Sequence, residues 1–195
     1  MSMRRALIAV ICAALLVALV AANRLVPSYD RQTRPISTSG AIGERVRTTA
    51  FEIRADHVSV GHTLVEKDGL GEKPQRTNGL WVLVWADLTG VDEPVTLDTA
   101  YLRTTDGHRY DTSDRMGFGS LDDTGSEPGL TRHGAIGFEI PPNRLAGARL
   151  VVGPAGGENR LGAQADIDLG LTPALARRMV ADAPPEVAYD GAEYR

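Results

Sequence analysis

The sequence of 195 residues predicts an all-β domain of the β-sandwich class. Short apolar or alternating segments recur between residues 46 and 169, and none of them has a helical period. Turn-forming residues are frequent, with 21 Gly and 11 Pro, and they fall between these segments. Many short strands separated by turns are typical of two packed antiparallel sheets, so this architecture is expected for residues 44–171.

A single transmembrane or signal helix is expected to precede the domain, in residues 1–22. Arg4 and Arg5 are followed by an uncharged apolar run at residues 6–22. As a helix, this run would span about 26 Å, near the lower limit for crossing a bilayer. The small residues Ala21 and Ala22 leave a cleaved signal peptide as the alternative. An uncleaved anchor predicts a single-pass protein of the cell membrane with its C-terminal domain outside, and cleavage predicts a secreted one.

Residues 23–43 are predicted to form a stalk between the membrane segment and the domain. This stretch is polar, contains Pro27 and Pro35, and has no apolar period.

The first strands of the domain are read from their side-chain alternation. Residues 51–56 alternate apolar and polar, and residues 57–60 continue in the opposite phase. Residues 80–88 give the strongest strand signal, because both faces are apolar and one of them carries Trp81 and Trp85. Such a strand is usually central and covered on both sides. The polar residues 67–78 are predicted to be a loop.

Five further strands and one helix complete the expected order. The strands are predicted at residues 95–104, 108–110, 134–140, 149–152 and 163–169, with a long loop over 111–128. Thr172 is a suitable N-cap for a short helix that begins at Pro173 and ends near Ala181. Residues 172–195 are therefore expected to form a short helix and a flexible tail.

These segments resemble the bacterial extracytoplasmic immunoglobulin-like domain family of unknown function, which is akin to a secreted mycobacterial immunogenic protein. The resemblance covers residues 43–169. It is carried by GLWVLVWADL at 79–88, PVTL at 94–97, YLRTTDGHRY at 101–110, PG at 128–129, GFEIP at 137–141 and LVV at 150–152. It implies an immunoglobulin-like β-sandwich outside the cell membrane and provides no active-site residue.

Composition narrows the classes of partner and chemistry. The formal net charge of −4 argues against nucleic acid as a ligand. The single cysteine, Cys12, lies in the apolar run, so the domain has neither a disulfide nor a thiolate metal site. Basic residues are almost all arginine, and this usage with abundant Ala and Gly suggests a GC-rich, actinobacterial genome.

No pattern of catalytic or metal-binding residues is evident. The four histidines lack metal-ligand spacing, the acidic residues form no calcium-loop pattern, and nucleophile and phosphate-binding motifs are missing from the sequence. We therefore expect no enzyme activity, no cofactor and no metal.

Two pairs of residues are candidates for contact with a partner. Trp81 and Trp85 share one face of a strand, about 13 Å apart, and either pack in the core or form an aromatic patch. Leu175 and Met179 share one face of the short helix and either dock on the domain or bind a partner.

The sequence thus favours a membrane-anchored, non-enzymatic protein-interaction module of the cell envelope. Its partner would be an envelope or membrane protein, in addition to membrane contact through residues 6–22. The alternative is a binder of an envelope glycan or lipid.

Overall fold

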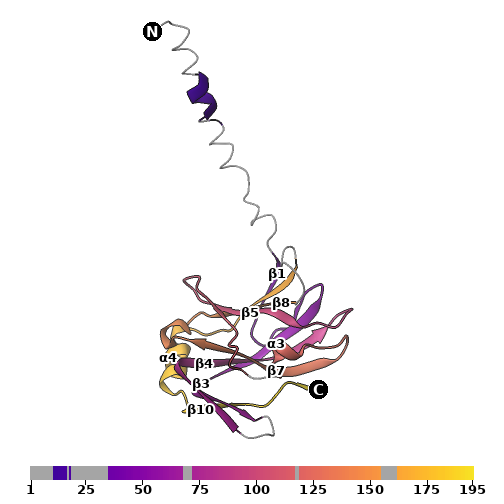
Figure 1. Cartoon of the computed structure of the whole chain (residues 1–195), viewed down its shortest axis with the longest axis vertical. Coiled ribbons are helices and arrows are strands. Elements are labelled where there is room, and N and C mark those ends of the chain that lie inside the picture. The colour runs from indigo at the N-terminus through magenta and orange to yellow at the C-terminus, as the bar shows by residue number, and fades with distance from the viewer. Residues whose placement is uncertain (1–10, 17, 19–34, 68–71, 117–118, 155–161) are drawn as a thin grey trace. The chain divides into compact units, whose positions relative to one another are not determined.

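A computed structural model describes residues 11–16, 18, 35–67, 72–116, 119–154 and 162–195 (Figure 1). The chain divides into two units, residues 1–34 and 35–195. Residues 11–16 and 18 of the first unit are helical, and the rest of the predicted anchor at residues 1–22 lies outside the described residues. Among the helices that can be described, none has the length and hydropathy needed to cross a membrane.

The second unit contains two β-sheets, which confirms the predicted all-β sandwich. The first sheet has the order β1-β9-β8-β5-β6. Its strands are β1 (Ile36–Ala41), β5 (Leu97–Arg103), β6 (Arg109–Asp111), β8 (Arg149–Pro154) and β9 (Ala163–Asp168). All its pairings are antiparallel except that of β1 with β9.

The second sheet has the order β10-β3-β4-β7-β11, with β2 paired to β3 beside this path. Its strands are β2 (Val46–Arg47), β3 (Phe51–Lys67), β4 (Glu72–Gly90), β7 (Thr131–Ile140), β10 (Glu186–Tyr189) and β11 (Glu193–Tyr194). The strand predicted from two apolar faces, now part of β4, lies centrally between β3 and β7, as expected.

The main core lies between the sheets and is built from their facing apolar residues, including Ile53, Val82, Phe138, Leu150 and Ile167. Three short helical elements accompany the strands: α3 (Leu121–Thr124), the 3₁₀ turn η1 (Pro142–Arg144) and α4 (Pro173–Ala181). α4 has the predicted bounds, and the Thr172 side chain accepts a hydrogen bond from the backbone of Leu175, as an N-cap does.

Three expectations about polar segments were wrong. Part of the predicted stalk forms strand β1, which pairs with β9 at the edge of the first sheet. An edge strand needs little burial, so polar residues can form it. β3 ends at Lys67 and β4 begins at Glu72, so described residues of the predicted loop at 67–78 belong to strands, where each strand supplies the other's backbone hydrogen bonds. The predicted flexible tail contains β10 and β11, which pair with the two edges of the second sheet.

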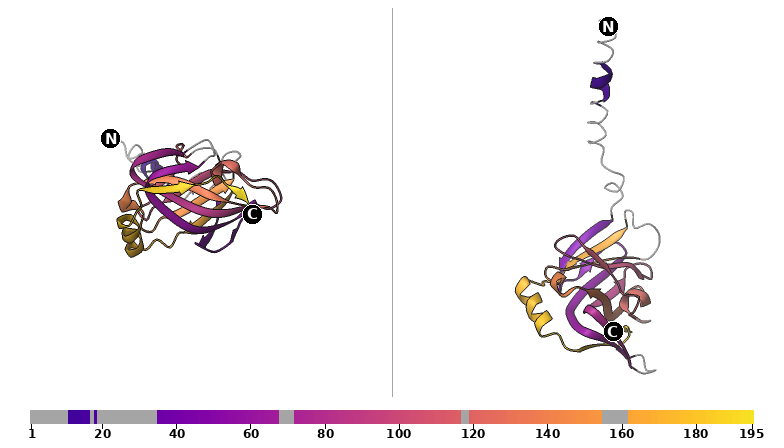
Figure 2. Two further views of the ribbon diagram at one scale, coloured as in Figure 1. Left: turned by 90° about the horizontal axis from the view of Figure 1, so that it is seen from below. Right: turned by 60° about the vertical axis from the view of Figure 1, so that its left-hand side comes forward.

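The second sheet bends strongly. Only three residues separate β10 from β11, so Tyr189 and Glu193 are at most about 14 Å apart, whereas four interstrand steps in a flat sheet span about 19 Å. The β3–β4 hairpin is also irregular, since Gly61 pairs with Trp81 and Thr63 with Arg76. The sheet therefore curls, as the views in Figure 2 show, and brings its two edges toward each other.

The curled sheet encloses a second, smaller core on its outer face. This cluster comprises Leu64, Trp81, Leu83, Met116, Ala135, Val187 and Tyr189, with Trp85 packed against it. Gly61 is required at the bend, because a Cβ there would lie 2.9 Å from the Cβ of Val187. The C-terminal segment thus covers apolar residues that would otherwise be exposed on the sheet.

Candidate functional site

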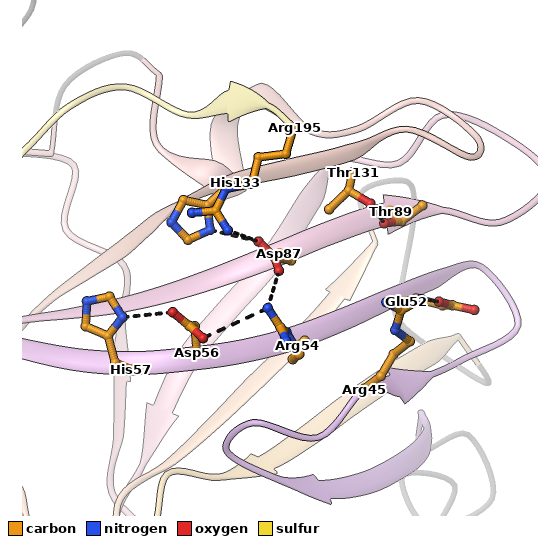
Figure 3. A network of polar contacts seen from close by, with 10 residues as sticks. All are labelled: Arg45, Glu52, Arg54, Asp56, His57, Asp87, Thr89, Thr131, His133 and Arg195. Atoms are coloured by element: carbon orange, nitrogen blue, oxygen red, sulfur yellow. Dashed lines mark hydrogen bonds and ion pairs between the residues drawn. The ribbon is translucent and has the colours of Figure 1, made fainter.

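Two surfaces are candidate sites, and each lies on an element that the sequence singled out. The first is the Trp85 cluster on the outer face of the second sheet, formed by Arg54, Asp56, His57, Trp85, Asp87, His133 and Arg195. Figure 3 shows all of these residues except Trp85. The second is the α4 groove, lined by Pro142, Asn143, Ala146, Pro173, Ala176, Arg177, Val180 and Ala181.

A β-bulge in β3 builds the Trp85 cluster. Ala55 pairs with Ala86 and His57 with Trp85, so Asp56 has no residue opposite it. This extra residue reverses the side-chain phase of β3 and places His57 on the same face as Trp85. His133, on β7, pairs with Asp87 and therefore points from the same face.

The two histidines cover both faces of the Trp85 indole. His57 stacks on one side with ring centroids 5.7 Å apart and planes at 9°, and His133 stacks at 5.7 Å and 20°. The stacked imidazoles reduce the area of the indole that is open to a sugar. The imidazoles are also separated by the indole, so they are too far apart to bind one metal ion at bond lengths of about 2 Å.

Asp87 is the electrostatic centre of the cluster. Its carboxylate accepts hydrogen bonds from Arg54 at 2.8 Å and from His133 Nδ1 at 2.8 Å, with Arg195 at 3.4 Å. Burial disfavours ionisation of Asp87, but the hydrogen bonds from His133 and Arg54 and the charges of His133 and Arg195 outweigh it, so the pKa lies below the usual value.

Asp56 pairs with His57 at 3.2 Å, and its carboxylate lies 4.0 Å from Arg54. The charges of the cluster therefore compensate one another. The cluster joins β3, β4, β7 and the C-terminus, and it contains no hydroxyl or thiol that could act as a nucleophile.

Trp81 does not belong to the exposed cluster. Its side chain is fully buried in the second core, and its Nε1 donates a hydrogen bond to the carbonyl of Gln75 at 2.8 Å. Trp85 is half-buried. The structure therefore assigns Trp81 to core packing, and the two tryptophans do not form an open aromatic patch.

The α4 groove has a volume of about 710 Å³ between α4 and η1. Pro173, Ala176, Arg177 and Val180 contribute from one face of the helix, with the spacing of a helical stripe. Of the two residues predicted on this helix, Met179 packs against the main core, whereas Leu175 is 36% exposed. Met179 therefore docks the helix, and Leu175 is exposed on the side of α4 that faces away from the groove.

Another pocket, apart from the α4 groove, is acidic. Asp114, Asp122 and Asp123 line it with Ser120 and Thr112, in a volume of about 270 Å³. Burial is the main reason that the pKa of Asp122 is raised. Within the described part of the chain, no three His, Cys, Asp or Glu side chains are placed to hold a metal ion.

The sequence prediction missed His57, His133 and Asp87 as one cluster. The phase change between residues 51–56 and 57–60 was the available signal, since it marks the bulge at Asp56. The strand pairing that brings His133 beside Asp87 depends on the sheet order, which the side-chain pattern alone does not give.

No protein-family model matches the chain, and no curated protein matches it. It is similar in structure to an uncharacterized β-sandwich protein from Clostridium difficile 630, with a TM-score of 0.45 and 13% identity over 70% of this chain and 96% of that one. The yjhA protein from Bacillus subtilis has a TM-score of 0.48 and 13% identity over 66% of this chain and 99% of its own. A conserved hypothetical protein from Bacillus anthracis has a TM-score of 0.43 and 12% identity over 58% and 88%. These are distant likenesses in architecture, and the two-sheet assignment rests on the strand pairings of the chain itself.

Proposed function

We propose that the chain is a membrane-anchored, extracytoplasmic module with an immunoglobulin-like β-sandwich that binds another protein of the cell envelope and has no enzyme activity. The anchor and location follow from the apolar run at residues 6–22 and from the family resemblance. The proposed absence of catalysis follows from the sequence, which carries no catalytic motif.

The α4 groove is the observation that supports protein binding. It is lined mostly by apolar side chains. Concave apolar surfaces with few polar groups are the usual form of a binding site. The Trp85 cluster is less suitable, because its charges are paired and its indole faces are covered.

Mild crosslinking of native membranes, followed by co-purification with the full-length protein, tests this function. Ala181→Arg would place a large charged side chain in the groove, and Ala174→Arg is the matched control on an exposed alanine outside the lining. We expect a stoichiometric partner with the wild type and with Ala174→Arg, but not with Ala181→Arg. A partner that binds all three, or no partner with the wild type, would contradict protein binding through the groove.

A binder of an envelope lipid is the alternative function, because an acyl chain could also occupy an apolar groove of this volume. Mass spectrometry of lipids extracted from the purified full-length protein tests it. A lipid retained by the wild type and lost in Ala181→Arg would favour the alternative, and lipid recovered equally from both variants would exclude the groove as its site.

A further inference from the structure

The α4 groove combines apolar walls with the cationic side chain of Arg177, and Arg178 follows it in the helix. Among the described residues, neither Arg177 nor Arg178 makes an ion pair or a side-chain hydrogen bond, and no acidic residue lines the groove. By contrast, Arg144 in the neighbouring turn η1 pairs with Asp106. The unpaired positive charges that a ligand could contact are therefore those of Arg177 and Arg178 on α4.

The two arginines define more than one anionic position on the ligand. Consecutive residues of an α-helix point about 100° apart, so Arg177 faces the groove and Arg178 lies on the adjoining surface. Basic side chains thus continue from the groove onto the exposed side of the helix.

Two arginines favour a protein segment over a fatty acid as the occupant. A single carboxylate at the end of an acyl chain can compensate one arginine but leaves the other unpaired. A polypeptide can present several acids beside apolar side chains and so pair with both arginines while it fills the groove.

We propose that the α4 groove binds an acidic amphipathic segment of a partner protein. The apolar side chains of the segment fill the groove between α4 and η1, and its carboxylates pair with Arg177 and Arg178. This inference rests on the proposed protein-binding function and specifies the chemistry of the partner.

Site-specific photo-crosslinking identifies the occupant in native membranes. A benzophenone amino acid at Ala181 of the full-length protein reports on the groove, and the same label at Ala174 is the control. We expect an adduct from Ala181 whose mapped peptide contains at least two acids beside apolar residues. The adduct should be lost when the labelled protein also carries Arg177→Glu.

A binding measurement tests the charge complementarity directly. The captured segment is synthesised as it stands and with its acids replaced by lysine, and both peptides are titrated against the full-length protein in detergent by fluorescence anisotropy. We expect Arg177→Glu to lower the affinity for the acidic peptide by about tenfold or more, and we expect this variant to bind the lysine peptide more tightly than the acidic one.

The outcomes distinguish the inference of an acidic partner from the proposed protein-binding function. A captured segment without acids, or an affinity that Arg177→Glu leaves unchanged, would overturn the acidic partner but leave protein binding intact. A lipid adduct at Ala181, or no adduct, would overturn both.

Discussion

Tyr189 offers a sensitive test of the second core. Its side chain is only 1% exposed, and its hydroxyl has no hydrogen-bond partner among the described residues. From β10 it packs against Trp81 and Leu83 in the second core. Tyr189→Phe removes the hydroxyl and keeps the ring, whereas Tyr189→Ala removes both, so the pair separates the polar group from the packing.

The two substitutions should change the free energy of unfolding in opposite directions. A buried polar group without a partner costs about 1–3 kcal/mol, so Tyr189→Phe is expected to stabilise the fold by about 1 kcal/mol. Loss of a buried aromatic ring leaves a cavity and costs about 3–5 kcal/mol, which is expected for Tyr189→Ala.

The pH dependence gives a second readout from the same residue. Burial, followed by the charges of Glu66, Asp122 and Asp123, raises the pKa of Tyr189 far above its ordinary value of 10.0. Above pH 10 the unfolded state therefore loses the phenolic proton while the folded state retains it. Stability contributed by neutral Tyr189 is full below pH 10 and falls as the pH rises further, by up to about 1.4 kcal/mol per unit.

Urea unfolding of the full-length protein in detergent, followed by tryptophan fluorescence, measures both effects, since Trp81 lies in the same cluster. The difference between wild type and Tyr189→Phe should grow above pH 10, because the other tyrosines contribute equally to both proteins. A Phe variant that is less stable than wild type by about 1 kcal/mol, or pH curves that stay parallel above pH 10, would refute this account of the hydroxyl.

Three further predictions concern the Trp85 cluster and α4. Asp87→Asn should lower the free energy of unfolding at pH 7 by about 1–2 kcal/mol, because it weakens charged hydrogen bonds. The difference from wild type should vanish as the pH falls through the depressed pKa of Asp87, and urea unfolding at pH 7 and pH 2 measures it. His57→Ala should increase iodide quenching of Trp85 by uncovering one indole face, and unchanged quenching would show that the stack does not shield it. Thr172→Ala should cost about 1 kcal/mol by removing the N-cap of α4, and Thr172→Ser should retain most of that stability in the same unfolding assay.

The sequence predicted those elements whose side chains are patterned by burial. The central strand at Leu80–Leu88 could be recognised because both faces are apolar, and α4 because Thr172 and Pro173 mark its start. β1 and β11 were missed for the opposite reason. They are edge strands without a buried side chain, and backbone hydrogen bonds leave little trace in the sequence. β10 does alternate, with Val187 and Tyr189 buried, but it has only four residues and its partner β3 lies more than 100 residues earlier.

The candidate sites show the same limit at the level of contacts. The shared face of Trp81 and Trp85 was recognised from their spacing, but spacing could not show that the sheet curls over one and that imidazoles cover the other. Likewise, α4 was expected from its cap and its apolar residues. The groove depends on the turn η1, which comes about thirty residues earlier and is brought beside the helix only by the tertiary fold.

The order of the strands in the chain has a consequence for biosynthesis. Both outer edges of the second sheet are completed by β10 and β11, whose partners in β3 and β7 are made much earlier. Until residues 186–194 have been made, these edges are unpaired and the second core lacks Val187 and Tyr189. The domain can therefore close only at a late stage of its synthesis, and any export that requires an unfolded polypeptide can proceed before this step.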